Sequence, residues 1–211
     1  MIPLTPQQRA TIVLTELKRL FPTPKPSLHF SNNWELVVAV VLSAQTTDKQ
    51  VNVVTKTLFE KYKTVDDYLS AQLDVFAEDM HSVSFYKTKA KHILAAAKIF
   101  DAEFKRVLPK TIADMMRLPG VGRKTANVVL GQAYGIAEGI AVDTHVTRLA
   151  QKFGLTNQSD PKKIEQDLMV LFPKEEWFLF TVRMIEYGRE YSTARKVADE
   201  MDPISILLKK T

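Results

Sequence analysis

Apolar residues recur along most of this chain at the three- and four-residue spacing that is typical of amphipathic α-helices. Thr5 and Gln8 form a capping-box pattern, which predicts that a first helix begins there and continues to Leu20. The same spacing predicts further helices over residues 34–42, 48–62, 65–70, 73–80, 87–104, 111–118, 123–133, 144–153, 161–172 and 175–187. No segment shows the alternating pattern of a half-buried β-strand, and no motif repeats at a fixed interval. We therefore predict an all-α fold.

Local signals refine the second and third of these helices. Residues 34–42 are almost uniformly apolar, so this helix is expected to be buried. Pro22, Pro24 and Pro26 interrupt the chain ahead of it and predict an extended connector. Asp48 is expected to cap the helix that follows.

The composition is that of an ordinary globular protein, with 45% hydrophobic and 25% charged residues in a chain of 211. Lys and Arg number 29 against 24 Asp and Glu, which gives a net charge of +5 at pH 7. The isoelectric point is about 9.3. Many basic proteins bind nothing acidic, so the charge favours a polyanionic partner such as nucleic acid without identifying it.

The chain contains no cysteine. Disulfides, thiolate zinc sites and cysteine-ligated iron–sulfur clusters are therefore excluded, and packing must stabilise the fold. No apolar run reaches the roughly 18–20 residues that a membrane-spanning helix needs. The first residues also lack the charged-then-apolar layout of a secretion signal. We expect a cytoplasmic protein with no membrane partner, associated with the nucleoid if the source is bacterial.

The most informative segment is Leu118–Ala126, with the sequence LPGVGRKTA. One helix is expected to end at its start and another to begin near Arg123, with Gly120 and Gly122 taking positive φ in the tight turn between them. Backbone N–H groups at a helix N-terminus bind phosphate, and Arg123 and Lys124 add positive charge beside them. A bare Gly-x-Gly usually only joins two helices. The proline, the glycines and the two cations together favour a phosphate site.

Three ordered segments carry a resemblance to a known family. Residues 118–130, LPGVGRKTANVVL, resemble the helix–hairpin–helix signature of the endonuclease III family of DNA glycosylases. Residues 142–145, VDTH, resemble its catalytic aspartate motif, and residues 42–48, LSAQTTD, are similar to its lesion-pocket segment. The resemblance extends from about residue 8 to about residue 196, which is most of the chain.

The resemblance implies that Lys124 is the catalytic nucleophile and Asp143 its partner carboxylate. A lysine must be neutral to attack, and the positive end of the helix dipole together with Arg123 disfavours its protonated form. The implied reaction is attack on C1′ of the damaged nucleotide, release of the base and β-elimination from the imine that results. Alone, Lys124 would more simply be a solvated phosphate contact. Asp143 also has the place of a helix N-cap, and the two roles are compatible.

The residues expected to contact DNA are Gly120, Val121, Gly122, Arg123, Gln45, Phe85 and His145. Gln45 resembles the family residue that enters the double helix opposite the extruded base, but a surface or capping glutamine is an equal interpretation. His145 is expected either to contact a phosphate or, more simply, to be satisfied within its own helix.

The loop around Phe85 departs from the family pattern. Relatives usually have Gly followed by a Leu wedge, whereas this chain has Ser84 and Phe85. Phe85 is expected either to act as an apolar wedge in DNA or to pack in the core. Lys87 and Lys89, just after it, are expected to lie on a solvated face and to add some attraction for DNA.

The C-terminal region also departs from the family. Many relatives carry four cysteines there that bind an iron–sulfur cluster, and Ser192 stands where the first would be. With no cysteine present, we expect no cluster and no other cofactor. We expect apolar residues of the tail to dock on the second lobe in its place, namely Ile204, Ile206, Leu207 and Leu208. The alternative is a frayed terminus.

By resemblance, residues 26–136 form a six-helix lobe with the hairpin, and residues 1–25 with 137–211 form a second helical lobe, with a DNA-binding cleft between them. The implied function is a base-excision-repair glycosylase and AP lyase that removes oxidised pyrimidines. Its partner would be double-stranded DNA with damaged bases or abasic sites, bound by a monomer. One alternative is a relative that acts on adenine opposite oxidised guanine or on mismatched thymine. The other is a non-catalytic helix–hairpin–helix DNA-binding module.

Overall fold

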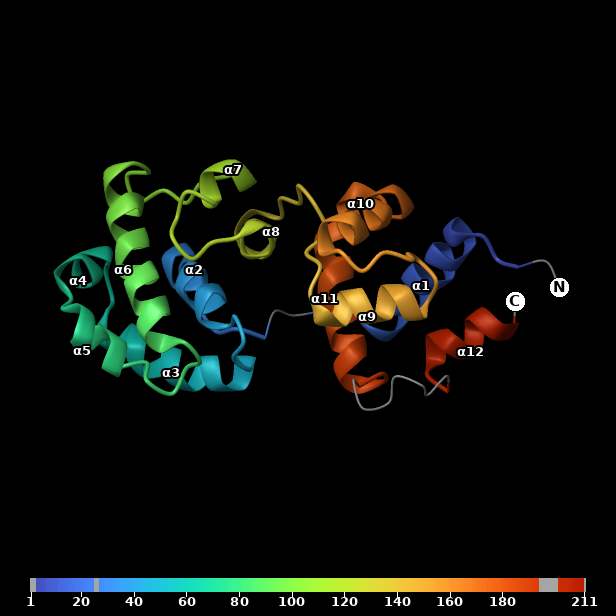
Figure 1. Cartoon of the computed structure of the whole chain (residues 1–211), viewed down its shortest axis with the longest axis horizontal. Coiled ribbons are helices and arrows are strands. Elements are labelled where there is room, and N and C mark those ends of the chain that lie inside the picture. Colours follow the sequence, from blue (N-terminus) through green and yellow to red (C-terminus); the bar gives the residue numbers. More distant parts are fainter. Residues whose placement is uncertain (1–2, 25–26, 194–200, 211) are drawn as a thin grey trace. The chain divides into compact units, whose positions relative to one another are not determined.

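The computed structural model describes residues 3–24, 27–193 and 201–210, and within those ranges the chain is helical with no β-strand. The all-α prediction is therefore confirmed. The helices are α1 (Pro6–Leu20), α2 (Asn33–Leu42), α3 (Asp48–Lys61), α4 (Val65–Ser70), α5 (Leu73–Glu78), α6 (Tyr86–Ala102), α7 (Ile112–Met115), α8 (Arg123–Tyr134), α9 (Thr144–Lys152), α10 (Pro161–Leu171), the short 3-10 helix η1 (Lys174–Glu176), α11 (Trp177–Glu190) and α12 (Pro203–Lys210) (Figure 1).

Side chains cap several of these helices, and two of the caps test predictions made from the sequence. The capping box of α1 is present, because Thr5 accepts from the backbone of Gln8 and Gln8 accepts from the backbone of Thr5. The expected cap of α3 is wrong by one residue. Thr47 accepts from Gln50 N, and Asp48 is the first residue inside the helix. A β-branched hydroxyl and a carboxylate are both good caps, so the sequence did not distinguish the neighbours.

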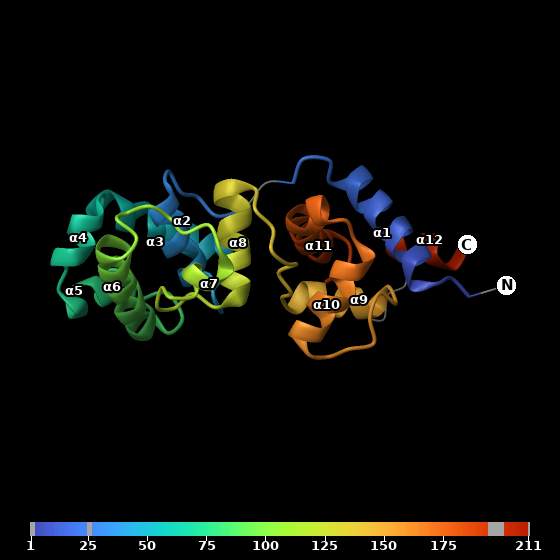
Figure 2. The ribbon, with the colours of Figure 1, turned by 90° about the horizontal axis from the view of Figure 1, so that it is seen from above.

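The helices divide into two compact units, each with its own core (Figures 1 and 2). One unit is Pro26–Ile136 and contains α2 to α8; we call it the central unit. The other combines Met1–Lys25 with Ala137–Thr211 and contains α1 and α9 to α12; we call it the terminal unit. Each unit is described by itself below.

Helix α2 is the core helix of the central unit, as its apolar sequence predicted. Every residue from Trp34 to Leu42 is buried, and α2 packs against α3, α6 and α8. Trp34 stacks on Phe100 of α6, with ring centroids 5.0 Å apart, and meets the edge of Tyr68 of α4. These aromatic contacts join α2 to α4 and to α6.

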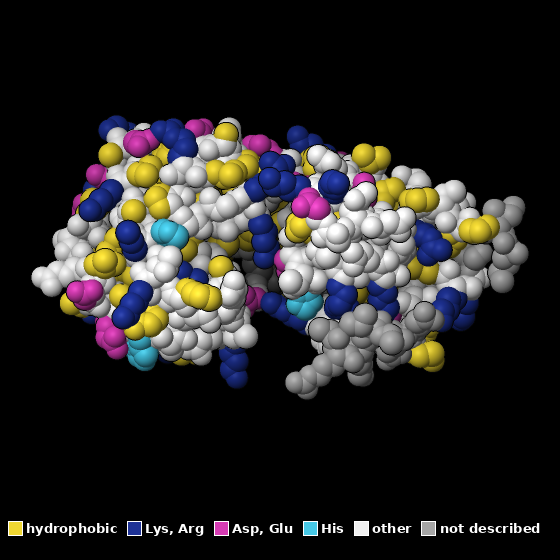
Figure 3. All heavy atoms as spheres, viewed as in Figure 1, with side chains coloured by type: hydrophobic (Ala, Val, Ile, Leu, Met, Phe, Trp, Pro, Cys, Tyr) yellow, Lys and Arg dark blue, Asp and Glu magenta, His cyan; other side chains and the backbone are white. Residues whose placement is uncertain are grey.

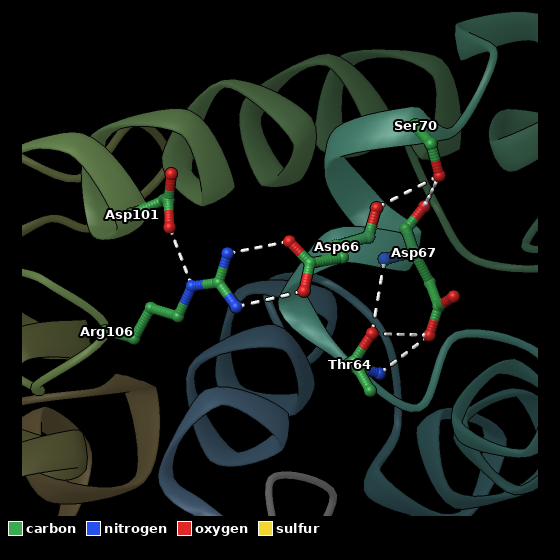
Figure 4. A network of polar contacts seen from close by, with 6 residues as sticks. All are labelled: Thr64, Asp66, Asp67, Ser70, Asp101 and Arg106. Atoms are coloured by element: carbon green, nitrogen blue, oxygen red, sulfur yellow. Dashed lines mark hydrogen bonds and ion pairs between the residues drawn. The ribbon is translucent and has the colours of Figure 1, made fainter.

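A polar network connects α4 with the chain that follows α6 in the central unit (Figure 4). The Arg106 guanidinium donates to both carboxylate oxygens of Asp66, and its Nε donates to Asp101 at 2.6 Å. Asp67 completes the cap of α4 by accepting from Thr64. The network ties the chain after α6 to the first turn of α4. Because its charged groups are substantially exposed, it contributes modestly to stability.

The terminal unit is built on α11, which contacts α1 and α9. The last helix, α12, packs on α1, and its Ile204 is fully buried in the core of this unit. Leu208 packs against the same core, whereas Leu207 is 36% exposed. Docking of the apolar tail is thus observed for Ile204 and Leu208, while Leu207 faces solvent. No helix in the described part of the chain is long and apolar enough to span a membrane.

Candidate active site

The central unit carries the predicted hairpin, in which a seven-residue turn joins α7 to α8. Gly120 has φ +84°, and a Cβ built on it would lie 3.0 Å from His92 Cβ. Both observations require glycine at this position. Positive φ was also expected at Gly122, and that expectation is wrong. Gly122 has φ −89° and ψ 175°, which is the extended backbone of a helix N-cap.

The first turn of α8 presents a compact cationic surface. Gly122 has no side chain with which to cap the helix, and both Arg123 and Lys124 are exposed. A Cβ built on Gly122 would meet no protein atom within 4 Å. The turn is therefore open to a ligand and combines a helix N-terminus with two cations, which together favour binding of a phosphate.

Val121, between the two glycines, is directed into the unit. Its side chain is 6% exposed and belongs to the hydrophobic core. Its backbone N–H donates to the carbonyl of Leu118 at 3.0 Å. Val121 therefore anchors the turn to the core.

Asp143 lies in the terminal unit, at the start of α9. Its Oδ1 accepts from Val146 N at 2.8 Å, so the expected N-cap is confirmed. The side chain is only partly buried. The carboxylate therefore combines a fixed orientation with access to solvent.

His145 lies in the first turn of the same helix and packs against α11. The contact is close, because a Cβ built on Gly188 would lie 2.5 Å from His145 Nδ1. Arg148, one turn further, donates through Nη1 to Ser192 Oγ at 3.2 Å and through Nη2 to the Ser192 carbonyl. A side chain at residue 188 would collide with the His145 imidazole, and glycine leaves room for it.

Gln45 and Phe85 lie in two loops of the central unit, and both are exposed, Phe85 by 65%. The expectation that Phe85 packs in the core is therefore wrong. Both residues have left-handed backbone conformations, with φ +55° at Gln45 and +57° at Phe85. The left-handed backbone is strained for residues other than glycine, and such strain is concentrated at functional sites.

Comparisons with known proteins agree with a helix–hairpin–helix that has a cationic helix N-terminus. Residues 38–174 match the family model described as HhH-GPD superfamily base excision DNA repair protein. The chain is 44% identical to endonuclease III of Synechocystis sp. over 90% of its length and 87% of that protein. It is 43% identical to endonuclease III of Bacillus subtilis over 86% of its length and 83% of that protein. The chain belongs to the endonuclease III family.

Solved structures of the endonuclease III family share this fold. A trapped endonuclease III–DNA covalent intermediate matches with a TM-score of 0.89 and 40% identity, covering 95% of this chain and 94% of that one. A non-covalent endonuclease III–DNA complex matches with a TM-score of 0.90 and 40% identity, covering 98% of both chains. The protein is accordingly a base-excision DNA glycosylase and AP lyase of the endonuclease III type. Lys and Arg side chains are spread over the face drawn in Figure 3.

The iron–sulfur cluster of many endonuclease III relatives does not fit the donor groups of this chain. Ser192 stands where the resemblance has the first cysteine, and its Oγ accepts from Arg148 at 3.2 Å and from Lys152 at 3.1 Å. Two cations surround a position where a cluster needs a thiolate. Residues 194–196 of the same segment lie outside the described residues.

A buried polar network connects this region to the last helix. The carboxylate of Asp202 pairs with Lys152 Nζ at 2.7 Å and accepts from the Tyr187 hydroxyl, which in turn accepts from Ile204 N. Ser205 donates to the same carboxylate through its backbone and hydroxyl groups. Burial alone would raise the pKa of Asp202, but the hydrogen bonds from Lys152, Tyr187 and Ser205 outweigh it and hold the pKa below its ordinary value.

The sequence did not predict the burial of Lys89 in the central unit. Lys89 was expected on a solvated face but is 6% exposed, whereas Lys87 is exposed as expected. A signal was present, because Lys89 precedes the core residue Ile93 by one turn and shares its face of α6.

Proposed function

We propose that this enzyme removes oxidised pyrimidines from double-stranded DNA and cleaves the resulting abasic site, with Lys124 as the nucleophile. One observation carries the proposal. Lys124 is an exposed amine in the first turn of α8, directly after a glycine turn whose helix end lacks a side-chain cap. An accessible primary amine beside a phosphate-binding turn can attack a sugar carbon and form a Schiff base.

The reaction proceeds through a covalent imine. The Lys124 amine attacks C1′ of the damaged nucleotide, and the bond from C1′ to the base breaks as the base leaves with the bonding electron pair and gains a proton. Opening of the sugar ring gives an imine between Lys124 and C1′. Loss of a proton from C2′ then expels the 3′ phosphate by β-elimination, and hydrolysis of the imine frees the lysine.

Asp143 is proposed as the partner carboxylate of this reaction. A carboxylate near the sugar stabilises the positive charge that develops there as the base departs, and it also accepts a proton from the attacking amine. The hydrogen bond from Val146 N to Asp143 holds the carboxylate in one orientation. Capping and catalysis thus use the same group.

The remaining site residues are proposed to bind and deform DNA. The hairpin from Gly120 to Arg123 would bind a backbone phosphate, and His145 would contact a second one. Gln45 and Phe85 would fill the space in the double helix that an extruded nucleotide leaves. A single chain carries all of these groups, so we propose that the enzyme acts as a monomer.

Borohydride trapping on duplex DNA that contains one abasic site tests the nucleophile. The parent is expected to form a covalent adduct. Lys124→Gln is expected to form none, while the control Lys98→Gln, which changes an exposed lysine of α6, should react like the parent. An adduct formed by Lys124→Gln at the parent rate would assign the nucleophile to another residue.

Asp143→Asn separates capping from catalysis, because asparagine caps a helix about as well as aspartate. We expect the variant to fold normally and to lose about 10²- to 10⁴-fold in turnover. Full turnover by a normally folded variant would contradict the proposed role.

A panel of duplexes that carry different lesions, scored for the base released, tests the substrate class. Release of oxidised pyrimidines is expected. Preferential release of adenine opposite oxidised guanine, or of mismatched thymine, would replace this substrate assignment. Release of no base together with no covalent adduct would indicate a non-catalytic DNA-binding module.

A further inference from the structure

Two loops of the central unit that each carry a strained residue are in contact. The first loop, residues 43–47, joins α2 to α3 and carries Gln45. The second, residues 81–85, precedes α6 and carries Phe85. Ser84 N donates to Thr46 Oγ1 at 3.3 Å, so the loops are in direct contact. Two exposed side chains with left-handed backbones therefore project from one small region.

Lys89 connects the two loops. Its Nζ donates to the carbonyl oxygens of Leu42 at 2.8 Å and Ala44 at 2.5 Å, and to Thr46 Oγ1 at 3.2 Å. These acceptors precede and follow Gln45 in the chain. The backbone N–H of Lys89 donates to the carbonyl of Phe85 at 3.0 Å, but this is the ordinary first hydrogen bond of α6 and does not involve the side chain. The Lys89 ammonium bonds to both sides of Gln45, and it is linked to the loop of Phe85 through Thr46 Oγ1, which also accepts from Ser84 N.

The geometry uses the full donor capacity of the ammonium group. A lysine has three N–H donors, and each has one of these oxygens as its acceptor. The Leu42 carbonyl belongs to the C-terminal turn of α2, where carbonyls lack partners within the helix and the dipole is negative. The lysine therefore caps α2 and fixes the loop that begins there.

Stability alone does not explain a lysine at this position. The side chain is buried, its partners are neutral oxygens, and burial lowers the pKa of its ammonium. Removing a charge from water without a countercharge is unfavourable, and an apolar residue of similar length would fill the same volume at a smaller cost. A directional donor at this point is useful for holding a defined loop geometry.

We propose that Lys89 is a positioning residue that holds Gln45 and Phe85 in fixed conformations, ready to occupy the gap left by an extruded nucleotide. The proposal rests on the proposed function, in which these two side chains enter the DNA. Lys89 touches neither the lesion nor the reacting atoms. It acts by making the two loops rigid before DNA binds, which lowers the ordering cost of extrusion.

The test compares two reactions of Lys89→Met, which replaces the four-carbon stem of the lysine by an unbranched apolar chain of similar length and removes the ammonium. Base excision from a lesion duplex requires the gap to be filled, whereas β-elimination at an abasic site in single-stranded DNA does not. We expect single-turnover excision from the duplex to fall about 10- to 100-fold. The single-stranded reaction should stay within about twofold of the parent. Lys98→Met, which removes an exposed charge from the same helix, should leave both rates unchanged.

Two further variants separate positioning from general damage to the fold. Thr46→Val removes the hydroxyl that both Lys89 and Ser84 donate to, and it should slow duplex excision selectively without unpairing a buried charge. In a Gln45→Ala, Phe85→Ala background, Lys89→Met should cause little additional loss, because the side chains it positions are gone. Equal losses in both reactions, or a full additional loss in this background, would overturn the proposal.

Hydrogen exchange of the free protein supplies a readout that needs no activity. Lys89→Met should speed exchange at the amides of Thr46 and Ser84 while core amides of α2 keep their protection. Unchanged loop exchange, or unchanged duplex excision by a folded variant, would refute positioning by Lys89. A parent that neither excises a base nor forms a covalent adduct would refute the proposed function instead, and the exchange rates would still decide the role of Lys89.

Discussion

Replacing Ile204 by alanine tests how the terminal unit is held together without a cluster. Ile204 is fully buried between α12 and the core of that unit. The substitution removes three carbon atoms, at about 0.8 kcal/mol for each buried methylene-sized group, and leaves a cavity. With the cavity included, we expect a loss of about 2–5 kcal/mol in the free energy of unfolding. Leu207→Ala removes equally many carbons from an exposed position of the same helix and should cost under about 1 kcal/mol.

Urea unfolding followed by tryptophan fluorescence measures this difference. Trp177 lies in the terminal unit and donates through its indole N–H to the Phe172 carbonyl at 2.9 Å. Trp34 reports on the other unit, so a Trp34→Phe background isolates the relevant signal. Deletion of the residues after Asp202 should lower the midpoint at least as far as Ile204→Ala. Equal small shifts for Ile204→Ala and Leu207→Ala would show that α12 does not contribute to this core.

Two more predictions concern the same unit. Because the folded pKa of Asp202 is below its ordinary value, its contribution to stability is fully present above the unfolded pKa of about 4 and is lost as pH falls through the folded pKa. Asp202→Asn should therefore destabilise the protein at pH 7 and flatten the acid limb of a plot of unfolding free energy against pH; an unchanged limb would exclude this carboxylate as its source. Gly188→Ala should displace His145 and cost about 1–3 kcal/mol by overpacking, partly offset by about 1 kcal/mol of helix propensity. A rise in melting temperature, with DNA affinity unchanged, would show that the imidazole does not require this space.

Much of the fold and part of the site followed from local sequence. The three- and four-residue periodicity identified the helices because each buries one face, and Thr5 and Asp143 were identified as caps because capping involves only the next three residues. The hairpin was found in the same way, since a proline, two glycines and two cations fall within a few positions. The family resemblance then assigned chemistry to Lys124 and Asp143, which no local pattern identifies.

The helices, the hairpin and the lack of thiolate ligands were therefore predictable, because they depend on neighbouring residues or on composition. The burial of Lys89 depends on three-dimensional packing, because its acceptors lie 43–47 positions earlier in the chain. The same packing buries Ile204 and leaves Leu207 exposed. Each of these outcomes depends on which distant surface packs against a helix face, and a face is recognisable from periodicity while its partner is not.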